Sequence, residues 1–378
     1  MKYKVTALTP LLVGDGRELS PIDYMVWKDQ VNVLDQNRIF KLLARGPRLD
    51  GYLAQLRRAT KLDFASWGGF AQNFSQRRVP FESAELSNIW NAASSELLFI
   101  PTFAASHRGL YLPASALKGA LRTGLVFTRW SASTIDRVAA SIEGDRLPRR
   151  SGEAAEGGVQ ASQMRLFGLA DSDPVPTSAC KIFLTRTASL DTRQADRQLV
   201  WKVEGRGSVP PARVADATPT FAEMAVPGTE FVGGYQEHKF LRDPDVAKAL
   251  GWRAAPNLET LTAAANQYAA AQLELQANYA RTANLPALDA TVESLKRELE
   301  RARGASSTCL LCLGWGNGFL SKTAFLDTGH ESYRKILRAI PPLARSIRDN
   351  VPFPKTRRIV FANGQPSTLP GWVKFDLA

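Results

Sequence analysis

Residues 110–125 read LYLPASALKGALRTGL, an apolar segment that turns at Pro113 and then continues with helical spacing. Ser115 stands at the start of that spacing, where a serine hydroxyl can accept a backbone N–H and cap a helix. Because residues four apart share one face of a helix, the leucines that follow predict a buried stripe. These leucines are Leu117, Leu121 and Leu125.

Lys118 and Arg122 lie four residues apart in the same segment, on a different face from the leucines. A helix N-terminus carries free N–H groups and a partial positive charge, so two cations beside it suit a phosphate group. The alternative is a solvated basic face on a core helix. The spacing fits both interpretations equally well.

A strand and a glycine-bearing turn open the chain. Residues 2–7 alternate polar and apolar side chains, which predicts a strand with one apolar face. Residues 9–16 then read TPLLVGDG, and Gly14 and Gly16 give the backbone access to conformations that other residues disfavour. This turn is either a plain connection or a loop whose amides face an anion.

A second glycine-rich turn follows an apolar run near the C-terminus. Residues 309–319 read CLLCLGWGNGF, which predicts a buried strand that ends in a turn containing Gly314, Gly316 and Gly318. A P-loop needs glycine directly before its lysine, but Ser321 precedes Lys322. The segment therefore does not predict a nucleotide triphosphatase.

Composition limits the class of protein. The 378 residues are 44% apolar, enough for roughly two domains. The 48 basic and 36 acidic residues leave a net charge of +12, which favours an anionic partner. The longest apolar runs are far shorter than the roughly 18 residues that a membrane helix needs. With no signal peptide apparent and three cysteines, we expect a cytoplasmic protein without disulfides or a membrane partner.

The sequence does not predict a metal site, a cofactor or a catalytic centre. Cys309 and Cys312 form a single CxxC with leucines between them, whereas a structural zinc site needs four ligands. The three histidines are far apart in the chain, and a GxSxG serine motif is absent. We expect the CxxC to be part of a buried strand.

The rest of the chain suggests one helical insertion and two basic segments. Residues 258–303 are rich in Ala, Leu, Glu and Gln and are interrupted at Pro286, which predicts a helical hairpin. Residues 141–161 have the composition of a loop, and residues 188–218 that of a long basic excursion. Residues 334–358 hold eight basic residues and one acidic residue, the densest positive stretch. The two halves are compatible with diverged copies of a βαββαβ unit.

Five motifs in this order resemble those of the RAMP proteins of type III CRISPR effector complexes. The matching strings are LTPLLVGDG at 8–16, YLPASALKGALRT at 111–123, LFG with DS at 166–172, PGTEF at 227–231, and LGWGNGF with KT at 313–323. Two positions depart from the family pattern, because Leu12 stands where many relatives have histidine and Ala114 where they have glycine. Length and the KTRR sequence at 355–358 make the chain most similar to the Csm-complex subunit that caps the crRNA 3′ end.

The resemblance implies an α+β fold of two ferredoxin-like (RRM-like) domains, at residues 1–178 and 179–378, with a helical insertion around 257–303. It further implies a non-catalytic subunit of a type III-A complex whose partners are crRNA, other effector subunits (especially the backbone subunit), target RNA and host nucleases. A guide is bound whatever its sequence, so contacts should go to phosphates and sugars. The expected RNA-binding residues are Gly14, Gly16, Ser115, Lys118, Arg122, Gly314, Gly316, Gly318 and Lys322.

Two alternatives stay open. An endoribonuclease would need a base and an acid near the scissile bond, and Asp23, His107 and His238 are the candidates. For Asp23 a structural hydrogen-bonding role is the favoured interpretation. The other alternative is a subunit of the same machinery that holds the 5′ tag of the crRNA.

Overall fold

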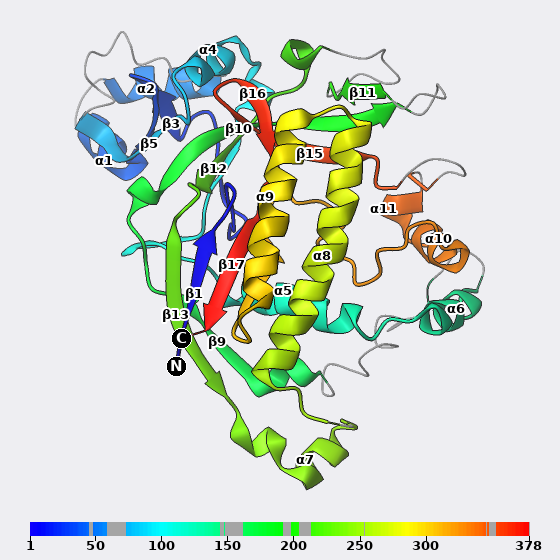
Figure 1. Ribbon diagram of the computed structural model, residues 1–378. Coiled ribbons are helices and arrows are strands. Elements are labelled where there is room, and N and C mark those ends of the chain that lie inside the picture. Colours follow the sequence, from blue (N-terminus) through cyan, green and yellow to red (C-terminus); the bar gives the residue numbers. More distant parts are fainter. Residues whose placement is uncertain are drawn as a thin grey trace.

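The computed structural model shows antiparallel sheets covered by helices (Figure 1). It describes residues 1–44, 48–58, 73–143, 147, 162–191, 198–203, 213–252, 254–344, 346–347 and 353–377. Most of the predicted loop at 141–161, and Arg193, Arg197 and Arg206 of the basic excursion, lie outside these residues. No helix in these ranges combines the length and apolar character needed to cross a bilayer.

The first sheet has five antiparallel strands and brings the two ends of the chain side by side. β1 lies at its centre, and the side chains of Tyr3, Val5 and Ala7 are buried as the alternation predicted. Strands from both sides of the expected boundary at 178/179 belong to this sheet, so the two expected domains share backbone pairing. In spatial order the strands are β14 (Thr308–Cys312), β17 (Trp372–Leu377), β1 (Lys2–Ala7), β13 (Glu230–Glu237) and β9 (Phe167–Ser172).

The second sheet is built around β10, the longest strand described. One face of β10 carries Leu184 and Ala188, which join a core cluster that includes Phe361. The cluster continues into the first sheet through Leu310 and Trp372. The strands are β11 (Gln198–Trp201), β10 (Cys180–Asp191), β15 (Thr356–Ala362) and β16 (Gln365–Thr368), with β12 (Thr220–Ala225) also paired to β10.

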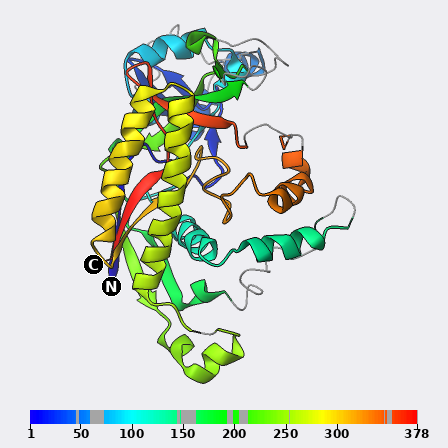
Figure 2. The same cartoon turned by 45° about the vertical axis from the view of Figure 1, so that its right-hand side comes forward.

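The predicted helical hairpin is confirmed as α8 (Leu258–Thr282) and α9 (Pro286–Arg303). Both helices pack against β14, which is an edge strand of the first sheet, and cover that edge (Figures 1 and 2). The buried Asn266 side chain accepts a hydrogen bond from Leu310 N at 3.0 Å and donates one to Thr308 O at 3.0 Å. The amide thus satisfies two backbone groups of an edge strand that would otherwise be unpaired.

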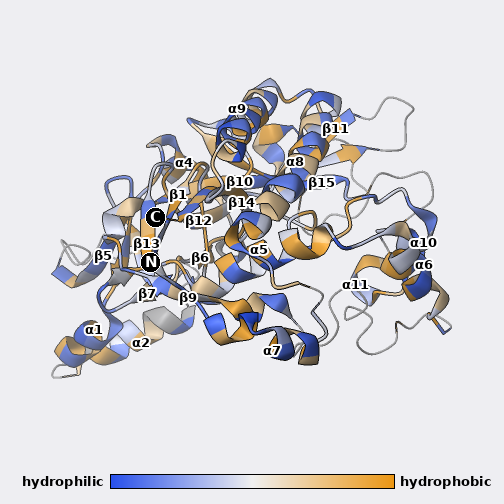
Figure 3. Ribbon diagram, turned by 60° about the horizontal axis from the view of Figure 1, so that its bottom comes forward, coloured by the Kyte–Doolittle hydropathy of each residue, from blue (hydrophilic) through white to orange (hydrophobic). Residues whose placement is uncertain are grey.

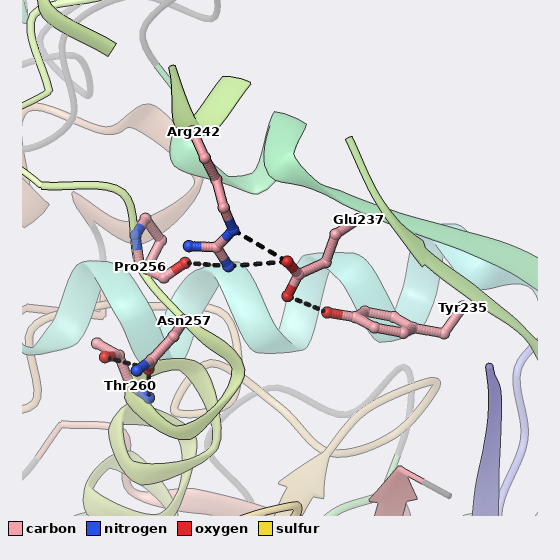
Figure 4. A network of polar contacts seen from close by, with 6 residues as sticks. All are labelled: Tyr235, Glu237, Arg242, Pro256, Asn257 and Thr260. Carbon is pink, nitrogen blue, oxygen red and sulfur yellow. Dashed lines mark hydrogen bonds and ion pairs between the residues drawn. The ribbon is translucent and has the colours of Figure 1, made fainter. Parts of the chain in front are cut away.

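A polar network joins the end of β13 to the start of α8 (Figure 4). The Glu237 carboxylate accepts from Tyr235 Oη at 2.9 Å and from Arg242 Nε at 3.0 Å and Nη2 at 2.8 Å. Arg242 also donates to Pro256 O at 3.3 Å, next to the N-cap of α8, where Asn257 Oδ1 accepts from Thr260 N. These bonds fix where the hairpin leaves the sheet.

A small three-stranded sheet and its helices form the N-terminal lobe. The carboxylate of Glu223 on β12 is fully buried and is paired by both terminal nitrogens of Arg77 on strand β5 (Ser75–Pro80). This ion pair links the lobe to the second sheet. The elements are β3 (Tyr24–Val26), β4 (Gln30–Leu34), β5 (Ser75–Pro80), α1 (Gln36–Leu43), α2 (Arg48–Arg58) and α4 (Glu85–Ala92), with β2 (Glu18–Leu19) and β6 (Ile100–Pro101) paired alongside.

Of the remaining helices, α6, α10 and α11 gather on one side of the molecule, far from α1 and α2 (Figure 3). α6 and α10 pack through a separate small core that includes Ile135, Tyr333 and Leu337. The bounds are α5 (Ala114–Phe127), α6 (Ala132–Ala140), α7 (Pro244–Ala249), α10 (Glu331–Arg338) and α11 (Pro341–Ala344), with the short hairpin β7 (Ala105–Ser106) and β8 (Gly109–Leu110) before α5.

Candidate nucleic-acid interface

The two glycine-rich turns lie directly against each other. Trp315 N donates to Leu12 O at 2.7 Å, which joins the turn after β14 to the turn after β1. Gly314 has φ +89°, and a Cβ there would lie 2.3 Å from Leu12 O. Only glycine allows this approach, because any side chain would overlap the carbonyl. The turns are about 300 residues apart in the sequence and lie in contact in the fold.

The segment before β17 holds this junction together. Gly371 N donates to Pro10 O at 3.0 Å, and Leu313 N donates to Gly371 O at 2.9 Å. Trp372 N donates to Thr9 Oγ1 at 3.0 Å, so the threonine of the first motif anchors the last strand. The backbone of both turns is therefore fixed by neighbouring segments before any ligand is present.

A ladder of backbone bonds extends this surface toward α5. Ala104 N donates to Val13 O at 2.9 Å, and Tyr111 N donates to Ala104 O at 3.0 Å. α5 begins three residues after Tyr111. Backbone hydrogen bonds thus connect the first glycine turn to the segment that leads into α5.

The N-terminus of α5 differs from the prediction. The N-cap is Pro113, and Ser115 is an exposed residue inside the helix, so the prediction of Ser115 as N-cap is wrong. The capping interaction comes from a distant segment, because Asp171 Oδ1 accepts from Ala114 N at 2.7 Å. This carboxylate satisfies the first helical amide and places a negative charge at the helix start. We therefore expect Lys118, more than the helix terminus, to supply attraction for a phosphate.

The sequence analysis assigned no role to Asp171 and Ser172, although both belong to a quoted motif. Ser172 Oγ accepts from Leu112 N at 2.9 Å, and this bond lies beside the Asp171 cap. Together the two side chains fix the segment that leads into α5. The sequence contained the DS motif at 171–172, but only the fold shows that these two side chains bind the backbone at the start of α5.

The side chains of α5 divide as predicted between a buried and an outward face. Leu117, Leu121 and Leu125 are buried. Lys118 is half-buried and Arg122 is exposed, one helical turn further along. The leucine stripe anchors the helix against α8 and β9 and leaves both cations on its other side.

A cation that the sequence analysis did not select lies on the second glycine turn. The Arg358 guanidinium is 4.4 Å from the centre of the Trp315 ring, and Arg358 Nη1 donates to Thr185 Oγ1 at 3.3 Å. Gly316, with φ +82°, makes room for this side chain, since a Cβ there would lie 3.1 Å from Arg358 Cδ. The KTRR sequence had suggested basic character but not this contact.

The segment after the second turn is anchored on α8. The Tyr268 hydroxyl lies within hydrogen-bonding distance of Leu320 O (2.6 Å) and Thr323 O (2.7 Å). Gln272 Nε2 donates to Leu320 O at 2.7 Å. Gly318 and Lys322 are exposed on either side of this anchor. Gly14 and Gly16 are exposed on the first turn, and Gly16 has φ +89°.

The two cysteines of the CxxC motif, Cys309 and Cys312, are free thiols on the buried strand β14. Cys309 is fully enclosed in β14, and burial raises the pKa of its thiol far above the ordinary value. Burial also raises the pKa of Cys312 to about 12, so both thiols are protonated at neutral pH. Among the described residues, no group of three or more His, Cys, Asp or Glu side chains could hold a metal ion.

The nuclease candidates occupy separate places. Asp23 Oδ2 accepts from Ser20 N at 2.8 Å and from Ser20 Oγ at 2.6 Å, which fits the structural role favoured for it. His107 is exposed in the turn between β7 and β8. His238 directly follows Glu237, the last residue of β13.

Comparison with known proteins establishes the family. The model of the RAMP superfamily matches residues 4–234, more than half of the chain. The chain belongs to the RAMP superfamily. No curated protein matches it significantly. The predicted family is therefore confirmed.

Two solved structures share the fold of this RAMP protein over nearly its whole length. One is a chain of the cryo-EM structure of a Csm–crRNA–target RNA ternary complex of a type III-A CRISPR-Cas system, with TM-score 0.67, 18% identity and coverage of 100% of both chains. The other is the crystal structure of T.onnurineus Csm5, with TM-score 0.55, 18% identity, and coverage of 98% of this chain and 99% of that one. The predicted α+β fold of ferredoxin-like domains is thereby confirmed.

Proposed function

We propose that this RAMP protein is a non-catalytic subunit of a type III-A effector complex that binds the crRNA backbone near its 3′ end. The observation that carries the proposal is the direct contact of the two glycine-rich turns through Trp315 N and Leu12 O. Shape similarity to a chain of a Csm–crRNA–target RNA complex and to Csm5 supports the same assignment.

The proposed contacts do not distinguish between bases. The exposed backbone of Gly16 and Gly318 can approach a ribose-phosphate strand closely, and Lys118, Arg122 and Lys322 supply positive charge. Phosphate and sugar contacts carry no sequence information, which is what a variable guide requires. In this proposal the partners are the crRNA and the other subunits of the complex. All the RNA-binding residues expected from the sequence keep that role, and Ser115 keeps it as an exposed residue of α5 and not as the helix cap.

RNA affinity measured against salt tests this proposal. The double variant Lys118→Ala with Arg122→Ala should weaken binding of several unrelated crRNA sequences to a similar extent. Each cation that contacts a single strand contributes a slope of about 0.7 in log K against log salt, so the slope should fall by about 1.4. Fluorescence anisotropy of labelled crRNA at a series of salt concentrations measures both quantities.

The matched control removes two exposed arginines with the same spacing on α9, Arg297→Ala with Arg301→Ala. It changes the net charge equally and should leave affinity and slope close to wild type. An equal effect of the two double variants would mean that general charge alone drives binding. That result would contradict a defined site on α5.

Two further measurements separate the alternatives. Crosslinking within the assembled complex, with crRNA labelled at the 5′ or the 3′ end, should mark this chain with the 3′ probe. Exclusive marking by the 5′ probe would reassign the subunit.

Incubation of labelled repeat RNA with the purified protein and Mg²⁺ should leave the RNA intact. Cleavage that Asp23→Ala or His107→Ala abolishes would establish an endoribonuclease.

A further inference from the structure

A cavity of about 950 Å³ is lined by residues of α4 and of strands β10, β15 and β16 of the second sheet. Figure 1 shows α4 beside β16 at one end of the molecule. Its apolar lining includes Leu184 and Phe361 from the second sheet, Ile89 and Leu97 from α4 and the segment after it, and Val214. A site of this size and apolar lining can enclose several side chains.

One cationic side chain of the second sheet lines this cavity. Arg186 on β10 is 6% exposed, and its guanidinium lies over the Phe361 ring at 5.4 Å. Arg186 Nε is buried and makes no hydrogen bond to the part of the chain that the structure describes. The Asp216 carboxylate lies near enough to act on the Arg186 charge, but it leaves this Nε–H without an acceptor. A buried donor without a hydrogen-bond partner is costly, so the unpaired Nε–H points to a ligand group that accepts from it.

The rim of the cavity has the opposite charge. Glu85, Glu96 and Asp216 line the opening, and Asp216 also pairs with Arg213 at 3.0 Å. A polyphosphate strand would be repelled by these carboxylates before it reached Arg186. The arrangement suits a ligand with one negative group at its tip, apolar groups behind the tip, and positive groups at the rim.

We propose that this cavity docks a peptide segment of a partner protein that directs a carboxylate to Arg186 while its flanking basic residues contact Glu85 and Glu96. A peptide can present these three features together, because a carboxylate, apolar and basic side chains can follow one another along one short chain. The guanidinium geometry favours a carboxylate, which it binds through two parallel hydrogen bonds.

The docking site is independent of the proposed RNA interface. Successive side chains of a strand point to opposite faces of its sheet. Thr185, which contacts Arg358 beneath the second glycine turn, and Arg186, which faces the cavity, are neighbours on β10. The second sheet therefore separates the two surfaces, and a variant of one should leave the other intact.

Selection from a peptide library tests the proposal. One synthetic library has nine-residue peptides with a fixed central Asp, randomised apolar neighbours and lysines at both ends; a second library replaces the Asp with Asn. The full-length protein should retain the Asp library about tenfold more strongly, the size expected of one charge-assisted hydrogen bond. Arg186→Met should abolish this preference.

Lys181→Met is the matched control, because it removes one positive charge from the same strand outside the cavity. It should keep the preference for Asp. Equal retention of both libraries by the wild-type protein, or an undiminished preference in Arg186→Met, would overturn the proposal. Loss of crRNA affinity in Arg186→Met alone would assign the cavity to RNA instead.

Thermal unfolding distinguishes a docking residue from a structural one. Methionine retains much of the apolar stem of Arg186 and removes the buried charge, so the Tm of Arg186→Met should equal or exceed that of wild type. A clear fall in Tm, with Lys181→Met unchanged, would show that Arg186 stabilises the folded chain. That outcome would remove the reason for assigning it to a ligand.

Discussion

At the scale of single residues, the glycine turns require glycine for two different reasons. Gly314 must be free of a side chain because Leu12 O occupies the space that a Cβ would need. Gly318 has φ +79° but no atom within 4 Å of such a Cβ, so only its backbone conformation favours glycine. The first kind of glycine holds the two turns together, and the second leaves an open surface for a ligand.

Gly314→Ala should therefore separate the turns. A left-handed backbone conformation costs a residue with a side chain about 1–2 kcal/mol, and the overlap with Leu12 O adds to that cost. We expect a loss of at least about 2 kcal/mol in the free energy of unfolding, together with weaker crRNA binding. Urea unfolding followed by circular dichroism and anisotropy with labelled crRNA measure these effects.

Gly119→Ala provides the comparison, because Gly119 is an exposed residue of α5 and a Cβ there meets no atom within 4 Å. Alanine should stabilise the helix by about 0.5–1 kcal/mol. If Gly314→Ala behaved like Gly119→Ala, the close contact of the turns would be wrong.

At the scale of elements, the helical hairpin protects the edge of the first sheet. β14 has β17 on one side and α8 on the other, where Asn266 is hydrogen-bonded to the strand backbone. An unpaired edge strand invites pairing with another chain. α8 and α9 therefore stabilise the strand that leads into the second glycine turn, and so act on the proposed site from a distance.

Asn266→Leu should leave Leu310 N and Thr308 O without partners inside the core. Each unsatisfied buried group costs about 1–3 kcal/mol, so for two groups we expect a loss of about 2–6 kcal/mol in stability. Hydrogen exchange at the Leu310 amide should accelerate as well. Gln267→Ala, at the neighbouring exposed position, should change stability by less than about 0.5 kcal/mol. Slow exchange at Leu310 in Asn266→Leu would contradict this role.

At the scale of the whole molecule, one buried ion pair connects the N-terminal lobe to the second sheet. Burial raises the pKa of Glu223, and the adjacent Arg77 guanidinium opposes that rise. The backbone of Phe81, just after β5 of the same lobe, forms an isolated parallel β-bridge with Ile182 of β10. The position of the N-terminal lobe therefore depends on this ion pair, because the buried Glu223 carboxylate has its Arg77 partner only when the lobe is packed against the second sheet.

Arg77→Met should cost about 3–5 kcal/mol, because it leaves the buried Glu223 carboxylate without its partner. The folded state would then hold a proton on Glu223 to higher pH than the unfolded state, so the deficit should shrink as the pH falls through the raised pKa. Urea unfolding at several pH values measures this dependence.

The double variant Arg77→Met with Glu223→Met removes both charges and should recover a large part of the lost stability. Failure to recover would show that the methionines themselves, and not the unpaired charge, cause the loss.

Local patterns in the sequence determined the elements of this protein. The alternation at residues 2–7, the leucine stripe of α5, the hairpin broken at Pro286 and the buried CxxC strand all follow from side-chain spacing, which is a property of neighbouring residues. The ordered glycine motifs likewise identified the RAMP family.

Only the tertiary structure decided which of these residues meet. Asp171 caps a helix 57 residues away, Trp315 binds Leu12, and Arg358 covers Trp315. The Arg186 cavity likewise combines strands and a helix from both halves of the chain. Such contacts arise from long-range strand pairing, which brings distant segments together without leaving a periodic signal in either one.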